Sequence, residues 1–132
     1  MTDRCLTVFP HWAWAIIHGS KRIENRTWRT SYRGRLWIHS GRRRRPEASD
    51  LEVLVDLPDY ETLQESAIIG YVSLVDIVPL HEVGGRPFAI GPWCWVLERP
   101  TPVEPILCSG QVSLWNPPLR ALRKVRHIRT QQ

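Results

Sequence analysis

The sequence has few cysteines, and it lacks the long apolar runs of a membrane protein. Its three cysteines, at positions 5, 94 and 108, form no Cys-x-x-Cys pair, which argues against a disulfide framework and a structural zinc site. No apolar run approaches the ~20 residues that span a bilayer. No signal-peptide block with a cleavage site opens the chain. We therefore expect a reduced, cytoplasmic protein with no membrane partner.

Motifs for common cofactor and nucleophile chemistry are also missing. There is no G-x-x-x-x-G-K-[ST] phosphate loop and no G-x-S-x-G nucleophile elbow. The five histidines, at positions 11, 18, 39, 81 and 127, lack the H-x-x-x-H spacing of metal ligands. We expect neither a metal ion nor a cofactor.

The 132 residues correspond to one domain, and 42% apolar and 23% charged residues are ordinary for a globular chain. Short apolar runs between Pro/Gly turns predict strands at 6–9, 35–39, 67–78, 93–98 and 112–115, and an extended segment at 21–28. Helical patterns cover 11–18, 47–56 and 119–125. Regular β-α-β alternation is missing, so we predict an α+β domain with a small, mixed or closed sheet and two to three flanking helices.

The helix predicted at 11–18 has two unlike faces. By the i, i+4 rule, the face that we expect in the core carries Trp12, Ala13, Ile16 and Ile17. The other face, which we expect to border a cleft, carries His11, Trp14 and His18. Gly19 follows as the residue that ends the helix.

Charge is divided into blocks along the chain. Residues 1–45 carry a net charge of +9, residues 46–82 carry −9, and residues 83–132 carry +5. A basic surface is typical of proteins that bind nucleic acid, although these blocks could instead neutralise each other. The run Arg42–Arg45 is therefore either a set of phosphate contacts with salt-dependent affinity or a charge partner of the acidic block. Tryptophan is abundant, and Trp14 and Trp28 could either flank a base or pack in the core.

The segment WAWAIIHGSKRIENRTW, residues 12–28, has the densest unusual content. Its pattern resembles the W-A-x-x-I-x-x-G-x-K-x-x-E-x-R signature of the ASCH domain, through Trp12, Ala13, Ile16, Gly19, Lys21, Glu24 and Arg26. RGRLWIHS, AIIGYVSLVDIV, WCWVLERP and GQVSLWNPP resemble later parts of that domain in order. The resemblance covers residues 6–118, with one departure: the most similar branch usually reads Q-P-W where this chain has Pro10, His11 and Trp12.

The resemblance implies a PUA-like β-barrel with helices packed at its side, and the handling of RNA or a modified nucleoside. We expect one such domain over residues 1–132, with its core at 6–118 and a basic C-terminal helix and tail at 119–132. Some small ASCH proteins remove acetyl from N(4)-acetylcytidine, and others are assigned ribonuclease activity. In the amidohydrolase branch the region supplies a catalytic Lys and Thr and a later Glu. Lys21 matches that Lys, Glu24 stands at the Thr position, and Glu98 and Glu104 are both candidates for the later Glu.

The chain has sixteen arginines and only two lysines, of which Lys21 is one. This suggests that position 21 requires an amine rather than a guanidinium. A desolvated amine can lower its pKa and act as a base, whereas the alternative is a phosphate or salt-bridge contact at a helix end. Glu24 and Arg26 lie two apart on an apparent strand and face the same side, either as a structural ion pair or as part of the site. A carboxylate near Lys21 raises the pKa of the amine, which opposes a role as base unless burial outweighs it.

We predict a domain that binds nucleic acid, RNA rather than DNA, or a modified nucleoside, in a basic cleft around Lys21. The alternatives are an amidohydrolase on an acylated nucleoside such as N(4)-acetylcytidine, a ribonuclease, or a protein-interaction module that docks through residues 46–82. The candidate catalytic residues are Lys21 and Glu24. The candidate nucleic-acid contacts are Arg26, Trp14, Trp28, His39, Ser40, Arg42, Arg43, Arg44 and Arg45.

Overall fold

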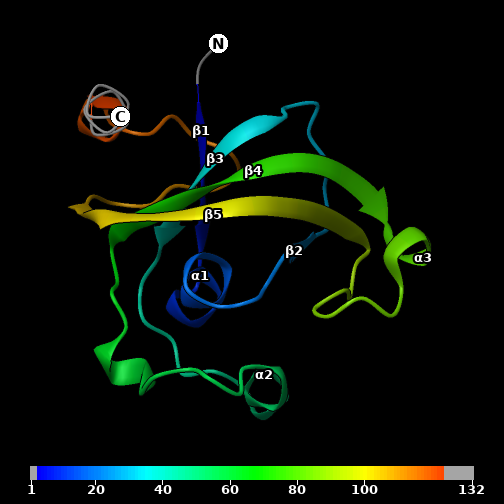
Figure 1. The fold of residues 1–132 in the computed structure, drawn as a ribbon. Helices are drawn as coiled ribbons and strands as arrows, with labels where there is room; N and C mark the ends of the chain where they lie inside the picture. Colours follow the sequence, from blue (N-terminus) through cyan, green and yellow to red (C-terminus); the bar gives the residue numbers. More distant parts are fainter. Residues whose placement is uncertain (1–2, 124–132) are drawn as a thin grey trace.

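A curled five-stranded sheet arches over a central helix (Figure 1). The computed structural model describes residues 3–123. The strands are β1 (Arg4–Val8), β2 (Ile23–Arg26), β3 (Gly34–Ser40), β4 (Ala67–Pro79) and β5 (Trp93–Leu107), in the order β1-β3-β4-β5-β2. β1 runs parallel to β3, and the other pairs are antiparallel. The predicted α+β domain with a small mixed sheet is therefore confirmed.

The helices are α1 (Pro10–Ile17), α2 (Ala48–Val53), α3 (Leu80–Val83) and the 3-10 turn η1 (Tyr60–Thr62). α1 lies in the hollow of the sheet, and the segment with α2 and η1 runs on the far side of α1 from β4 and β5 (Figure 1). Residues 119–123 are helical, and the rest of the predicted C-terminal helix and the tail lie outside the described residues. No helix within residues 3–123 is both long and apolar enough to cross a membrane.

The sheet separates two apolar clusters because successive strand residues point to opposite faces. The larger cluster joins Ala13, Ile16 and Ile17 of α1 to the hollow face, and the smaller one lies on the outer face around Trp37 and Ile68. Gly70 of β4 brings helix and sheet together. A Cβ at Gly70 would lie 2.5 Å from the carbonyl oxygen of Thr101 and 2.8 Å from Cδ1 of Ile17. Only glycine allows this approach.

The last long strand differs from the prediction, because β5 extends past residue 98 to Leu107. Its prolines at 100, 102 and 105 lack the N–H that a strand donates, so the sequence favours an end at 98. The structure accommodates them with shifts in register against β4 and a positive φ of 53° at Arg99. β4 itself confirms the strand predicted at 67–78.

Two other predicted elements need correction. The strand expected at 112–115 is wrong: the chain bends at 112–114, where Ser113 has φ of 58°, and only Trp115 pairs, with Cys5. The helix expected at 47–56 is shorter, because Leu54 leaves the helical conformation with φ of −104° and ψ of 58°. None of the residues of α2 is buried, and its apolar residues Leu51 and Val53 are exposed.

The faces of α1 are also partly different from the prediction. Trp12 is only half-buried, whereas His11 is buried at 2% exposure. His11 is buried because the segment that carries α2 lies against it, with Oδ2 of Asp50 3.3 Å from Nε2 of His11. The His11 ring also packs between those of Phe9 and Trp12, with centroid distances of 5.9 Å and 4.9 Å.

Candidate functional site

Lys21 is buried at the end of the turn that follows α1. α1 ends where the N–H groups of His18 and Gly19 both donate to Trp14, and the Lys21 N–H then donates to the carbonyl of Ala15 over 3.1 Å. The turn directs the side chain inward, where Lys21 is 2% exposed. Its ammonium donates to the carbonyl of Ile23. A cation in the middle of a protein needs such partners, because burial removes its hydration.

Two aromatic rings and a carboxylate surround the Lys21 ammonium. Nζ lies 4.9 Å from the ring centre of Trp12 and 5.2 Å from that of Phe88, both within the range of a cation–π contact. Oε1 of Glu24 is 3.5 Å away. Burial is the largest influence and lowers the pKa of Lys21 below its ordinary value, while the Glu24 carboxylate opposes the shift.

Glu24 and Arg26 share one side of β2, as the two-residue period predicts. Nε of Arg26 lies 2.9 Å from Oε2 of Glu24, and the guanidinium also donates to the carbonyl of Thr7 over 3.1 Å. Glu24 therefore sits between two cations, and the group of Lys21, Glu24 and Arg26 carries a net positive charge when all three are ionised. The structure brings these three predicted residues together.

Asn25 holds a loop over this group. Its amide nitrogen donates to the carbonyl of Phe88 over 2.9 Å, and its amide oxygen accepts from the N–H groups of Ile90 and Gly91 at 2.9 Å and 2.8 Å. These bonds hold the loop in which the Phe88 ring meets that of Trp12 edge to face, with ring centres 6.5 Å apart. Sequence reasoning missed both Asn25 and Phe88, and the available signal was an aromatic residue within a Pro/Gly-rich loop.

A pocket of 370 Å³ opens beside Lys21, and its walls include Trp12, Glu24, Asn25 and Phe88. Its volume lies within the usual range for small-molecule sites. A second pocket of 360 Å³ adjoins it and shares Trp12, Glu24 and Asn25. Here we call the first the Lys21 pocket and the second the Arg26 pocket, because Arg26 lines only the second of the two. Trp12, expected in the core, forms a wall of both.

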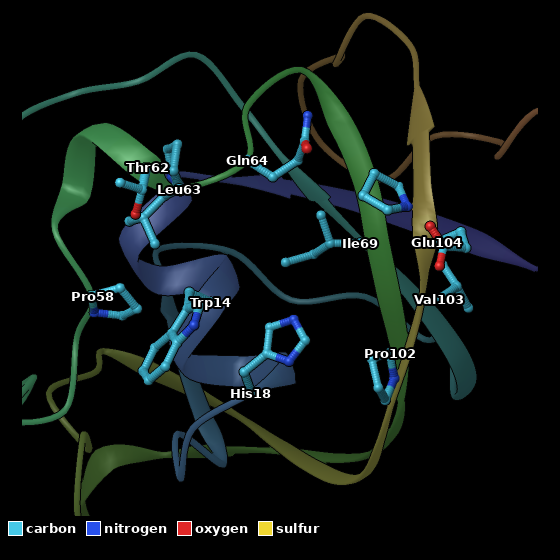
Figure 2. A pocket seen from close by; sticks show the side chains of 12 residues that line it. Trp14, His18, Pro58, Thr62, Leu63, Gln64, Ile69, Pro102, Val103 and Glu104 are labelled. Carbon is cyan, nitrogen blue, oxygen red and sulfur yellow. The ribbon is translucent and has the colours of Figure 1, made fainter.

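Trp14 belongs to a different and larger pocket of 640 Å³. Figure 2 shows Trp14 on α1 and His18 just past its end, facing Pro58 on one side and Pro102 of β5 on the other. The expected cleft-bordering role of this face is therefore seen for Trp14 and His18. Trp14 does not line the Lys21 pocket, so the structure does not bring it together with Lys21.

Contacts within the protein hold three other candidates in place. Trp28 meets Trp95 edge to face with ring centres 4.9 Å apart. His39 is held by the Thr7 hydroxyl at 3.2 Å and the Cys108 carbonyl at 2.7 Å, and burial lowers its pKa. Ser40 is buried and donates to a backbone carbonyl over 2.5 Å. None of the three lines the Lys21 pocket.

The arginine run divides into held and free side chains. Arg43 pairs with Glu65 at 3.7 Å, Arg44 pairs with Glu47 at 3.5 Å, and Arg45 lies over the ring of Tyr60 at 4.8 Å. Both carboxylates come from the acidic block, as the alternative interpretation of the charge blocks expects. Within residues 3–123, the guanidinium of Arg42 makes no ion pair, hydrogen bond or ring contact, and it lines the Arg26 pocket.

The later glutamates lie away from Lys21. Glu98 pairs with Arg99 at 3.2 Å, and Glu104 lines the pocket that contains Trp14. Neither lines the Lys21 pocket, so neither completes a set with Lys21 and Glu24. Among the described residues, no group of three or more His, Cys, Asp or Glu side chains could hold a metal ion.

The curled mixed sheet, with α1 in its hollow and the buried Lys21 group beyond it, defines a PUA-like domain. The family model of the ASCH domain matches residues 6–92, and the chain belongs to this family.

Both curated proteins and solved structures are similar to this chain. The mouse protein named activating signal cointegrator 1 is 37% identical over 83 residues, which cover 54% of this chain and 14% of that protein; its human counterpart is 35% identical over the same shares. The chain thus spans only a small part of their length. Crystal structures of ASCH from Zymomonas mobilis, and of a point mutant of that protein, superpose with TM-scores of 0.62 at 17% and 16% identity. They cover 96% of this chain and 94% and 98% of theirs, and they show the shared fold.

Proposed function

We propose that this ASCH domain binds RNA or a modified nucleoside, with one nucleoside in the Lys21 pocket. The observation that carries the proposal is a buried ammonium beside two aromatic rings that meet edge to face at a pocket wall. Trp12 and Phe88 offer apolar ring surfaces to a base, and the Lys21 group offers both donors and a carboxylate acceptor to its edge. Proteins commonly recognise single-stranded RNA in this way, by stacking bases on aromatic side chains and hydrogen bonding to their edges.

Electrostatics supports an anionic ligand at this site. The two cations Lys21 and Arg26 exceed the single negative charge of Glu24. Arg42, which has no ion-pair partner among residues 3–123, adds a further cation that lines the Arg26 pocket. Contacts between such cations and phosphates release counterions, so affinity must fall as salt rises. Family membership supports RNA over DNA.

The test is a fluorescence anisotropy titration with labelled single-stranded RNA at low and rising salt. Trp12→Leu and Trp14→Leu form a matched pair, because both residues are half-buried on α1 and only Trp12 lines the Lys21 pocket. We expect Trp12→Leu to weaken binding about tenfold, since stacking contributes ~1–3 kcal/mol per base. Trp14→Leu should bind as the unmodified chain does. Absence of binding at low salt, for RNA and DNA alike, would contradict the proposal.

A second candidate function is amide hydrolysis of an acylated nucleoside such as N(4)-acetylcytidine, and the depressed pKa of Lys21 favours it. A neutral Lys21 amine would take a proton from water as the water oxygen bonds to the acetyl carbon. The carbon–nitrogen bond then breaks as the proton passes to the leaving amine, and cytidine and acetic acid are released, the acid losing its remaining proton to solvent. Glu24 would orient the amine, because its Oε1 atom lies 3.5 Å away.

Lys21→Arg separates binding from this chemistry. Arginine keeps the charge but cannot act as a base at neutral pH, so acetate release should be lost while RNA binding is retained. Thermal melting of the variant shows whether the larger side chain is accommodated. If the unmodified chain binds RNA and releases no acetate, hydrolysis is rejected. Gel analysis of the recovered RNA tests ribonuclease activity in the same samples.

A further inference from the structure

A fourth pocket, of 380 Å³, lies beyond Arg42, where the parallel strands β1 and β3 end. Its lining includes the polar residues Thr7, Ser66, Ser109 and Gln111, together with His39 and Arg42. Here we call it the Ser109 pocket. None of the described residues that line it is acidic. Hydroxyl, amide and guanidinium groups without a carboxylate suit the phosphate and ribose of a nucleotide.

The three pockets form a continuous series. The Lys21 pocket shares Trp12, Glu24 and Asn25 with the Arg26 pocket. The Arg26 pocket in turn shares Thr7, Gly41 and Arg42 with the Ser109 pocket. Arg42 therefore stands at the junction of the last two, and no protein group holds its guanidinium among residues 3–123. A ligand that leaves the Lys21 pocket through the Arg26 pocket meets this free cation next.

Packing fixes the walls of the Ser109 pocket. Gly110 is pressed against β1 and β3, because a Cβ there would lie 2.7 Å from Oγ1 of Thr7 and 2.9 Å from the His39 ring. Backbone bonds join its loops: Cys108 donates to Ser66 over 3.0 Å, and Ser66 donates to Gly41 over 3.2 Å. His39, held between Thr7 and Cys108, thereby positions the pocket wall.

We infer that the ligand is a strand of at least two nucleotides rather than a free nucleoside. One nucleoside occupies the Lys21 pocket, the linking phosphate meets Arg26 and Arg42, and the neighbouring nucleotide occupies the Ser109 pocket. This inference rests on the proposed function and adds a second subsite to it. The dense charge of Arg43, Arg44 and Arg45 is not required, because Glu65, Glu47 and Tyr60 already engage those side chains.

Amide chemical-shift mapping by NMR tests the series directly. The probes are an equimolar mixture of the four ribonucleoside monophosphates and a random-sequence RNA pentamer pool. We expect both probes to shift amides of residues 21–26 and only the pentamer pool to shift those of 109–111. If the pentamer pool shifts 21–26 and leaves 41, 42 and 109–111 unchanged, the second subsite is overturned and the proposed function stands. If neither probe shifts 21–26, the proposed function fails, and this inference fails with it.

Arg42→Ala provides an independent measurement, with Arg45→Ala as the matched control from the same loop. We expect Arg42→Ala to weaken pentamer binding about tenfold and to reduce the salt slope by about 1, as loss of one phosphate contact requires. Its affinity for the monophosphate mixture should change much less. Arg45→Ala, whose side chain lies over Tyr60, should leave pentamer affinity within about twofold. Equal losses in the two variants would show that general charge, not the junction, attracts the strand.

Discussion

Lys21 experiences two opposing influences, because burial favours its neutral form and Glu24 favours its charged form. Glu24 does not depend on Lys21 alone, since Arg26 lies 2.9 Å from its other oxygen. The cluster therefore keeps a paired carboxylate when Lys21 loses its charge. This arrangement suits a residue whose role is in binding or chemistry rather than in holding the fold.

Lys21→Met tests that separation. The variant removes a buried charge, fills a similar volume and leaves Glu24 paired, so we expect the free energy of unfolding to change by less than about 1 kcal/mol. RNA binding should fall, because the cation in the pocket is gone. Urea unfolding and anisotropy, measured on the same preparation, check the two parts. A loss of stability beyond about 3 kcal/mol, the range expected when a buried pair is broken, would assign Lys21 a structural role instead.

His11 predicts how stability depends on pH. Burial lowers its pKa from the ordinary 6.5, so the folded chain keeps a neutral ring at a pH where the unfolded chain has taken up a proton. The free energy of unfolding should therefore decrease as pH falls through 6.5, and His39 adds to the decrease for the same reason. Urea unfolding at pH 7.5 and pH 5.5 measures the difference. The difference in free energy of unfolding between the two pH values should shrink in His11→Phe. It should persist in His18→Phe, which replaces an exposed histidine just past the end of α1. An unchanged difference in His11→Phe would argue against protonation of His11 as the cause.

At the residue level, the sequence predicted part of the site for a clear physical reason. Lys21, Glu24 and Arg26 are close along the chain, and strand periodicity alone places the last two on one side. Phe88 and Asn25 meet only because β2 pairs with β5 and the preceding loop folds back, which is a long-range arrangement. Local pattern carries no information about such contacts. The prediction for Trp12 was only partly right: it packs against the core cluster but also lines two pockets, and a helix face next to a pocket looks the same in sequence as one in the core.

Among the elements, α1 and β4 depend on each other most closely. Gly70→Ala should destabilise the fold by about 3 kcal/mol, because its Cβ would be forced against the backbone of β5 and the side chain of Ile17. Gly84→Ala is the matched control: its Cβ would meet only the Leu80 carbonyl oxygen, at 3.4 Å. We expect that variant to be as stable as the unmodified chain or slightly more so. Similar midpoints for the two variants in urea unfolding would contradict this account of the helix–sheet contact.

The elements also show where sequence patterns fail. The apolar run of β4 was predicted almost to the residue, because thirteen strand residues form one uninterrupted pattern. Whether β5 can accommodate its prolines, and whether Ser113 adopts a positive φ, depends on contacts with distant parts of the chain. The length of β5 and the bend at 112–114 were therefore not predicted. These errors lie away from the Lys21 pocket, and the candidate site was therefore little affected by them.

Across the whole molecule, folding pairs parts of the basic and acidic blocks, while at least one cation within residues 3–123 stays unpaired. Arg43 and Arg44 form ion pairs with glutamates of the acidic block, whereas Arg42 forms none among residues 3–123 and lies at the junction of two pockets. The +9 of the first 45 residues therefore overstates the charge available to a ligand. Block charge predicted an anionic partner, and among the described residues Arg42 is an unpaired cation that could contact one.

The most direct test of the proposed binding site is a crystal structure of the chain with a short single-stranded RNA. We predict a base beside Trp12 and Phe88, with the Lys21 group at its edge and a phosphate within reach of Arg42. Two results would contradict this prediction. One is RNA bound against Trp14 in the larger pocket, and the other is RNA held only by Arg43, Arg44 and Arg45 with the Lys21 pocket empty.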